Sequence, residues 1–86
     1  MTKKEFSKDR TYANLYEAVS HKKYPLIEKE ASALKRMSEG LGYVKLGELS
    51  GMIATSVKIH CYKSIPKTFR QLEEEYWKII RETDED

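Results

Sequence analysis

Hydrophobic residues recur with helical spacing in the first half of the chain. The window from residue 9 to 20 carries them at i, i+3, i+4 and i+7, namely at Tyr12, Leu15, Tyr16 and Val19. The window from residue 25 to 40 has a longer stripe, at Leu26, Ile27, Ala31, Leu34, Met37 and Leu41. This spacing puts each set on one face of a helix. Pro25 fits the first turn of the second helix, and Gly40 and Gly42 are suited to end it with a left-handed residue.

Two further windows show the same period. In residues 44–62 the shared face holds Leu46, Leu49, Ile53, Val57 and His60. In residues 65–82 the apolar face holds Phe69, Leu72, Tyr76, Ile79 and Ile80, with Trp77 at its edge. The acidic run at residues 73–75 is expected to face mostly solvent. Strand signals are weak, because the brief alternation at residues 57–62 lies inside a longer helical pattern.

The connections between these windows are about three to five residues long, and connections of this length join antiparallel neighbours. The pattern therefore predicts an all-α fold, an antiparallel up-down four-helix bundle whose first helix is short. We expect a flexible N-terminus at residues 1–8, one helical-bundle domain at residues 9–83 and an acidic C-terminal tail at residues 84–86. A chain of 86 residues can bury one core, which leaves no room for a separate catalytic domain.

Charge adds a mild asymmetry to this picture. Hydrophobic residues make up 40% and charged residues 35% of the chain, which suits a small helical domain and excludes a wholly disordered chain. The net charge of +2 is too small to indicate nucleic acid by itself. Residues 1–45 contain 10 basic and 6 acidic side chains, net +4, whereas residues 46–86 contain 6 and 8, net −2. The first half of the chain is therefore where a basic patch would lie.

Cys61 is the only cysteine, which rules out an intrachain disulfide and suits a reducing compartment. The first ten residues are charged and lack the apolar core of a signal peptide. No apolar run approaches the ~20 residues that span a bilayer. We expect a cytoplasmic protein without membrane association.

The titratable side chains form no recognisable catalytic set. His21 and His60 are the only histidines, too few for a zinc site. His60 and Cys61 are adjacent and would diverge by about 100° on a helix, which predicts a core-edge histidine and a small, partly buried thiol rather than a hydrolase pair. The glycines at residues 40–42 lack the strand that precedes a phosphate-binding loop. We therefore expect no enzyme activity, no cofactor, no metal and no small-molecule substrate.

Residues 31–49 resemble the signature of histidine phosphotransfer (HPt) domains, which are four-helix bundles. That signature reads roughly A-H-x-L-K-G and two small residues, then L-G, then a helix with L-x-x-L. This chain reads ASALKRMS from residue 31, then Leu41-Gly42, then Leu46 and Leu49. The last helix, with KSIPKTFRQLEEEYWKI from residue 63, is similar to the end of those domains, so the resemblance extends over residues 24–80.

Two positions depart from the HPt signature. The phosphorylated histidine of the family falls on Ser32, and a serine hydroxyl would need a general base to replace an imidazole that is nucleophilic near pH 7. The glycine of the signature falls on Arg36, so a long cation stands where the family lets a partner approach closely. The resemblance therefore implies a pseudo-phosphotransfer domain, a degenerate member that keeps the bundle and loses the phosphoryl chemistry.

Such a domain would act as a non-catalytic protein-binding module. The resemblance implies a regulator or inhibitor that docks on a receiver domain or histidine kinase of two-component type, or on another host protein. The small residues at 31–33 would leave the backbone accessible, and Lys35 with Arg36 would pair with the acidic pocket of a receiver domain. The expected partner-binding residues are Ser32, Lys35, Arg36, Glu39 and Lys29.

Three other interpretations of the sequence stay open. The same residues suit an ordinary bundle helix, with Ala31 and Leu34 in the core and Ser32, Lys35 and Arg36 facing solvent. The basic first half also suits, less strongly, a small nucleic-acid-binding helical protein whose affinity would fall steeply with salt. The small size and high charge fit a self-associating or host-directed protein of the kind that mobile elements encode.

Overall fold

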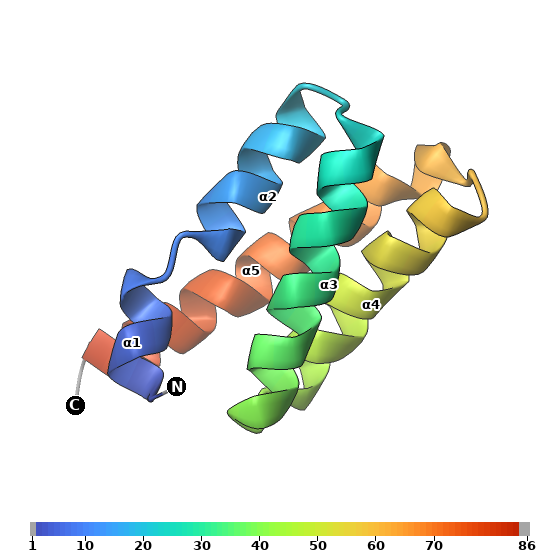
Figure 1. Ribbon diagram of the computed structural model, residues 1–86. Coiled ribbons are helices and arrows are strands. Elements are labelled where there is room, and N and C mark those ends of the chain that lie inside the picture. The colour runs from blue at the N-terminus through green and yellow to red at the C-terminus, as the bar shows by residue number, and fades with distance from the viewer. Residues whose placement is uncertain (1, 85–86) are drawn as a thin grey trace.

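The computed structural model describes residues 2–84, and this part of the chain is all-helical (Figure 1). Its elements are α1 (Lys3–Lys8), α2 (Thr11–Ser20), α3 (Tyr24–Gly40), α4 (Val44–Lys58), a 3₁₀ turn η1 (Tyr62–Ser64) and α5 (Ile65–Asp84). Within residues 2–84 there is no strand, and no helix is long and apolar enough to cross a membrane. The four longer helices, α2 to α5, pack together, as the hydrophobic pattern predicted.

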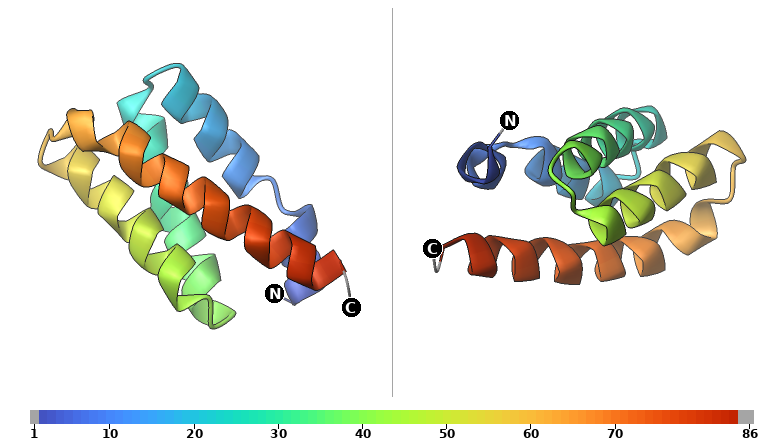
Figure 2. Two further views of the ribbon diagram at one scale, coloured as in Figure 1. Left: turned by 180° about the vertical axis from the view of Figure 1, so that it is seen from behind. Right: turned by 90° about the horizontal axis from the view of Figure 1, so that it is seen from below.

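The helices form two layers. α3 and α4 lie side by side and are joined by a short turn, and α2 flanks α3 (Figure 1). Figure 2 shows α5 as one long rod that crosses a single face of these helices. The molecule measures 39 × 20 × 18 Å, with α1 packed against α5 at one end.

Part of the stretch that we expected to be flexible, residues 1–8, is helical in the structure. α1 begins with a capping box, in which the Glu5 N–H donates to the Thr2 hydroxyl and the Thr2 N–H donates to the Glu5 carboxylate. Phe6 is 1% exposed and its ring packs 5.8 Å from that of Tyr76, centroid to centroid. The packed domain therefore begins before residue 9. A single buried ring has no periodic neighbours, so the helical period alone could not reveal it.

At the other end, Asp84 is the last residue of α5. The rest of the predicted acidic tail, residues 85–86, lies outside the described residues.

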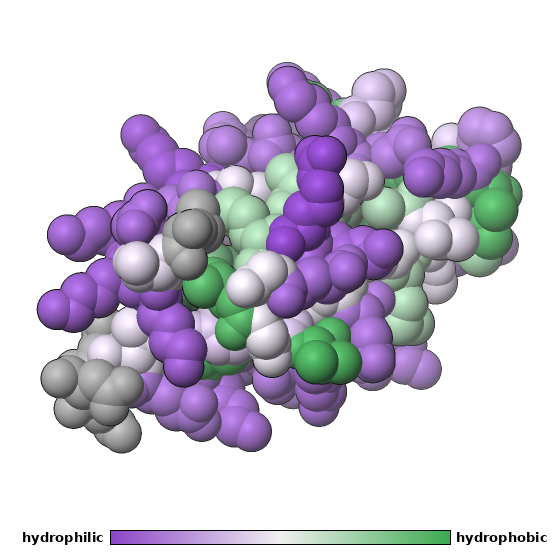
Figure 3. Space-filling view, turned by 60° about the horizontal axis from the view of Figure 1, so that its bottom comes forward, coloured by the Kyte–Doolittle hydropathy of each residue, from purple (hydrophilic) through white to green (hydrophobic). Residues whose placement is uncertain are grey.

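The core follows the predicted stripes in all four helices. Its buried members include Tyr12, Leu15, Ile27, Ala31, Leu34, Leu46, Leu49, Ile53, Val57, Phe69, Leu72, Tyr76 and Ile79. Tyr16 and Leu26, which the stripes also contained, are exposed instead. Tyr16 follows Leu15 and Leu26 precedes Ile27, and both of these neighbours are fully buried. Adjacent side chains on a helix diverge by about 100°, so Tyr16 and Leu26 point away from the core that Leu15 and Ile27 face. The surface seen in Figure 3 is mainly hydrophilic, with hydrophobic groups scattered between polar ones.

α3 ends in a Schellman motif centred on Gly42. The N–H of Tyr43 donates to the carbonyl of Ser38 (2.8 Å), and the N–H of Gly42 donates to that of Glu39 (3.2 Å). Gly42 has a φ of 81°, which confirms it as the left-handed residue. Gly40, the other predicted candidate, is the last residue of α3 and keeps a negative φ.

The same pair of hydrogen bonds ends α2 and α4, although neither helix has a glycine there. Lys22 and His60 occupy the left-handed position, with φ of 54° and 59°. Because the chain turns at His60, α4 stops at Lys58 rather than at residue 62. His60 and Cys61 leave the helix and are both exposed, so the prediction of a core-edge histidine and a partly buried thiol was wrong.

Candidate functional site

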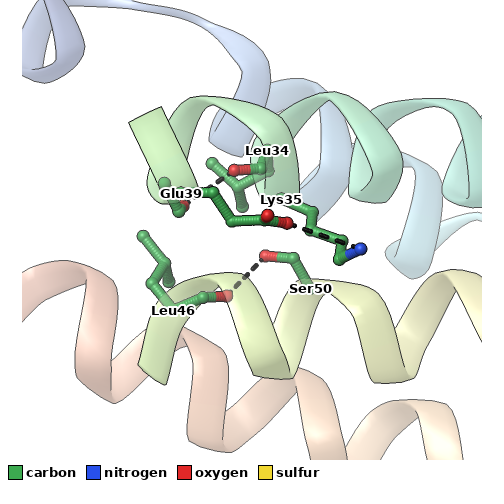
Figure 4. Close-up of polar contacts among 6 residues, drawn as sticks. Leu34, Lys35, Glu39, Leu46 and Ser50 are labelled. Carbon is green, nitrogen blue, oxygen red and sulfur yellow. Dashed lines mark hydrogen bonds and ion pairs between the residues drawn. The ribbon is translucent and has the colours of Figure 1, made fainter. Parts of the chain in front are cut away.

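Small residues allow α3 and α4 to pack closely. Ser38 of α3 and Ser50 of α4 are fully buried. Each hydroxyl donates to the carbonyl four residues earlier, Ser38 to Leu34 (2.7 Å) and Ser50 to Leu46 (2.8 Å). Figure 4 shows the bond between Ser50 and Leu46. These bonds satisfy the two hydroxyls inside an otherwise apolar contact, so the interface needs no polar partner from the opposite helix.

Two glycines of α4 extend this contact toward the surface. A Cβ at Gly47 would lie 3.4 Å from Cγ of Glu39, and a Cβ at Gly51 would lie 3.2 Å from Cδ and Cε of Lys35. The aliphatic stem of Lys35 therefore lies over the bare backbone of α4. Its ammonium forms an ion pair with Glu39 at 3.4 Å (Figure 4). Since both side chains are more than half exposed, the pair contributes little to stability.

An open groove follows the boundary between α3 and α4. Three of the predicted site residues, Ser32, Lys35 and Arg36, line it from α3. From α4 it is lined by Glu48, Gly51, Met52, Ala54, Thr55, Ser56 and Lys58. Met52 is exposed. The groove thus combines an apolar thioether and a glycine floor with cationic side chains.

The charge of the groove is net positive. Lys35, Arg36 and Lys58 line it together with a single carboxylate, that of Glu48. Arg36 makes no ion pair with any described residue, so its guanidinium is available for a carboxylate from outside. Ser32 is half-buried, and its hydroxyl, unlike that of Ser38, makes no hydrogen bond within residues 2–84.

The remaining predicted site residues lie apart from the groove. Lys29 and Glu39 are both exposed and neither lines it. Glu39 reaches the groove only through its ion pair with Lys35. The structure therefore brings together Ser32, Lys35 and Arg36, and it leaves Lys29 outside.

Sequence reasoning missed the part that α4 contributes to the groove. The available signal was a run of small residues at helical spacing in α4, Gly47, Ser50, Gly51 and Ala54. Such a run on a helix that also carries a leucine stripe indicates a face against which another helix packs closely. It does not show which neighbour that is, and the helix arrangement was needed to place it against Lys35.

Within residues 2–84, no group of histidine, cysteine or carboxylate side chains has the arrangement of a metal site. Comparison of the chain with protein-family models, with curated proteins and with solved structures found no match.

Proposed function

We propose that the protein is a non-catalytic protein-binding module that docks through the α3–α4 groove. The observation that carries this proposal is the grouping of Lys35 and Arg36 with Ser32 and Gly51 in one groove. Ser32 and Gly51 add little bulk to the groove, and the positive charge favours an acidic partner surface. An apolar centre with a polar rim, here Met52 beside cations, is the usual anatomy of a docking surface.

The resemblance to the HPt signature directs the choice of partner. It favours a receiver domain or a histidine kinase of two-component type, which the module would regulate or inhibit by occupying the docking site without relaying phosphate. Ser32 in place of histidine is the basis for this assignment. The proposal places the protein in the cytoplasm, where such partners lie, and it requires no cofactor and no small-molecule substrate.

The proposal also includes an up-down antiparallel order of the helices. The short turns between α2 and α3 and between α3 and α4 support this order. It would place the groove on the same pair of helices that an HPt domain uses to present its histidine.

Arg36 is expected to be the main anchor. Its planar guanidinium can donate two parallel hydrogen bonds to one carboxylate. A hydrogen bond to a charged group contributes about 1.5–3 kcal/mol. Its loss would weaken binding roughly tenfold to a hundredfold, since about 1.4 kcal/mol corresponds to a factor of ten.

The test is a calorimetric titration of the protein with isolated receiver domains and with isolated kinase domains. Arg36→Ala and Ser32→Trp should each weaken binding at least roughly tenfold, with little change in the thermal midpoint, because neither side chain belongs to the core. Lys29→Ala is the matched control, since Lys29 is a cation of the same helix outside the groove.

Two outcomes would contradict the proposal. If the unaltered protein binds neither domain at high micromolar concentration, the two-component partner is wrong. If Lys29→Ala weakens binding as much as Arg36→Ala, the partner does not bind specifically at the α3–α4 groove.

Nucleic acid is the weaker candidate for the groove. Glu39 pairs with Lys35, and Glu48 interrupts the positive charge, so a phosphate backbone would meet carboxylates as well as cations. A gel shift at low salt that disappears as salt is raised would favour nucleic acid over an acidic protein.

A further inference from the structure

A second groove, between α2 and α5, has a different chemistry. The ring of Tyr12 stacks on that of Tyr76, with centroids 3.9 Å apart and planes at 8°. The Trp77 indole stands edge-on to both, at 5.9 Å and 5.2 Å between centroids. Tyr12 and Tyr76 are buried, whereas Trp77 is 49% exposed and Tyr16 of α2 is 51% exposed. The groove therefore presents two aromatic side chains to solvent on a rigid aromatic base.

Two fixed carboxylates border the same groove. Those of Asp9 and Glu73 line it together with the aromatic residues. The Tyr12 hydroxyl donates to Oε2 of Glu73 at 3.0 Å, and Oδ1 of Asp9 accepts the N–H of Thr11 at 2.8 Å. Neither carboxylate forms an ion pair with a cation of the described chain. Both anions are thus oriented and left without a counter-charge.

The Tyr12 hydroxyl supplies a hydrogen-bond donor to this groove. Burial, and then the hydrogen bond to Glu73, raises the pKa of the Tyr12 phenol well above the ordinary tyrosine value. The protonated phenol of Tyr12 is the donor in this hydrogen bond, and the carboxylate of Glu73 is its acceptor.

We propose that the α2–α5 groove binds an arginine side chain presented by a protein partner. A guanidinium can lie against the exposed rings of Tyr16 and Trp77, where the aromatic π-system attracts a cation. The same guanidinium can donate to the carboxylates of Glu73 and Asp9. Arginine fits better than lysine, because its planar group stacks on aromatic rings and bonds to carboxylates at once.

Charge complementarity selects this occupant over the other candidates. The α3–α4 groove is lined mainly by cations, whereas the α2–α5 groove is lined by carboxylates and aromatic rings. An acidic partner surface would be repelled here. The proposal therefore stands independently of the function assigned to the α3–α4 groove.

The probe is a pair of acetylated, amidated pentapeptides, Ala-Leu-Arg-Leu-Ala and the same peptide with citrulline in place of arginine. Citrulline has nearly the shape of arginine and no charge. Trp77 is the only tryptophan of the chain, so its fluorescence and its indole NMR signal report on the groove directly. We expect the arginine peptide to shift the signals of Tyr16, Glu73 and Trp77, and the citrulline peptide to bind at least roughly tenfold more weakly.

Two variants separate the groove from general attraction to acidic residues. Glu73→Gln removes the charge but keeps an oxygen that can accept from Tyr12, so the aromatic base should stay intact. Glu74→Gln removes the same charge from the next residue of α5, which is exposed and outside the groove. The arginine peptide should bind Glu73→Gln at least roughly tenfold more weakly and should bind Glu74→Gln nearly as well as the unaltered protein.

The proposal is overturned if the two peptides bind equally, if the shifted signals lie on another surface, or if both variants lose affinity alike. It is also overturned if the groove signals shift with protein concentration in the absence of peptide and sedimentation shows a dimer. That result would identify a second copy of the chain as the occupant.

Discussion

Substitutions at Gly42 and Gly40 can separate the free-energy cost of the left-handed turn after α3 from effects on packing. A Cβ added at either glycine would meet no atom within 4 Å. The two positions differ in backbone conformation, because Gly42 has a φ of +81° and Gly40 is the last residue of α3. Alanine at these positions therefore changes the conformational energy of the backbone and leaves the core untouched.

The two substitutions are expected to have opposite signs. At Gly42, alanine in the left-handed conformation costs about 1–2 kcal/mol, and restriction of the unfolded chain returns about 0.4–1 kcal/mol. Gly42→Ala should therefore lower the free energy of unfolding by about 1 kcal/mol. At Gly40 the helical conformation suits alanine, so Gly40→Ala should raise it by about 0.5–1 kcal/mol.

Urea denaturation followed by far-UV circular dichroism measures both changes, provided that the m value stays constant. In thermal unfolding, a difference of about 1 kcal/mol corresponds to roughly 4–8 °C for a domain of this size. Lys22→Gly makes the reverse substitution at a φ of 54° and should stabilise the protein. Equal signs for Gly42→Ala and Gly40→Ala, or a neutral Gly42→Ala, would refute the reasoning.

The remaining predictions concern three buried aromatic residues, Phe6, Tyr12 and Tyr76. Phe6→Ala should lower the free energy of unfolding by about 3–5 kcal/mol in urea, because the ring is 1% exposed, and a loss below about 1 kcal/mol would show that α1 does not belong to the core. Burial raises the pKa of both Tyr12 and Tyr76, so the unfolded state loses these protons first as pH rises past the ordinary tyrosine pKa of about 10. The free energy of unfolding should therefore keep its full value below that pH and fall above it. Tyr12→Phe should make this fall shallower when urea midpoints are measured across the same pH range. An unchanged slope would contradict the raised pKa of Tyr12.

The helical period was enough to find α2, α3, α4 and α5, because each buries side chains that recur three or four residues apart. The helical period did not predict features that depend on one side chain or one dihedral angle. Phe6 is the buried side chain of α1, and α4 ends because His60 adopts a left-handed conformation that the sequence does not demand of a histidine.

The sequence predicted only the residues that α3 contributes to the candidate site. Ser32, Lys35 and Arg36 stood out through their positions in the HPt-like signature, and the structure places all three on one groove. The contribution of α4 depends on how that helix is rotated against α3, which no local pattern specifies. Likewise, the acidic run at residues 73–75 was expected to face mostly solvent, and no local pattern indicated that Glu73 accepts a hydrogen bond from Tyr12, a residue far away in the sequence.

Under the two proposals, the protein would distinguish partners by the sign of their charge. Figure 3 shows hydrophobic groups scattered among polar ones on one face of the molecule, and the lining residues of the two grooves differ in the sign of their charge. Opposite charges on separate helix pairs would orient an acidic partner on α3–α4, because the same partner would be repelled at α2–α5. An interaction at one groove should consequently survive Arg36→Ala or Glu73→Gln at the other, and a loss at both would mean that a single partner spans the two helix pairs.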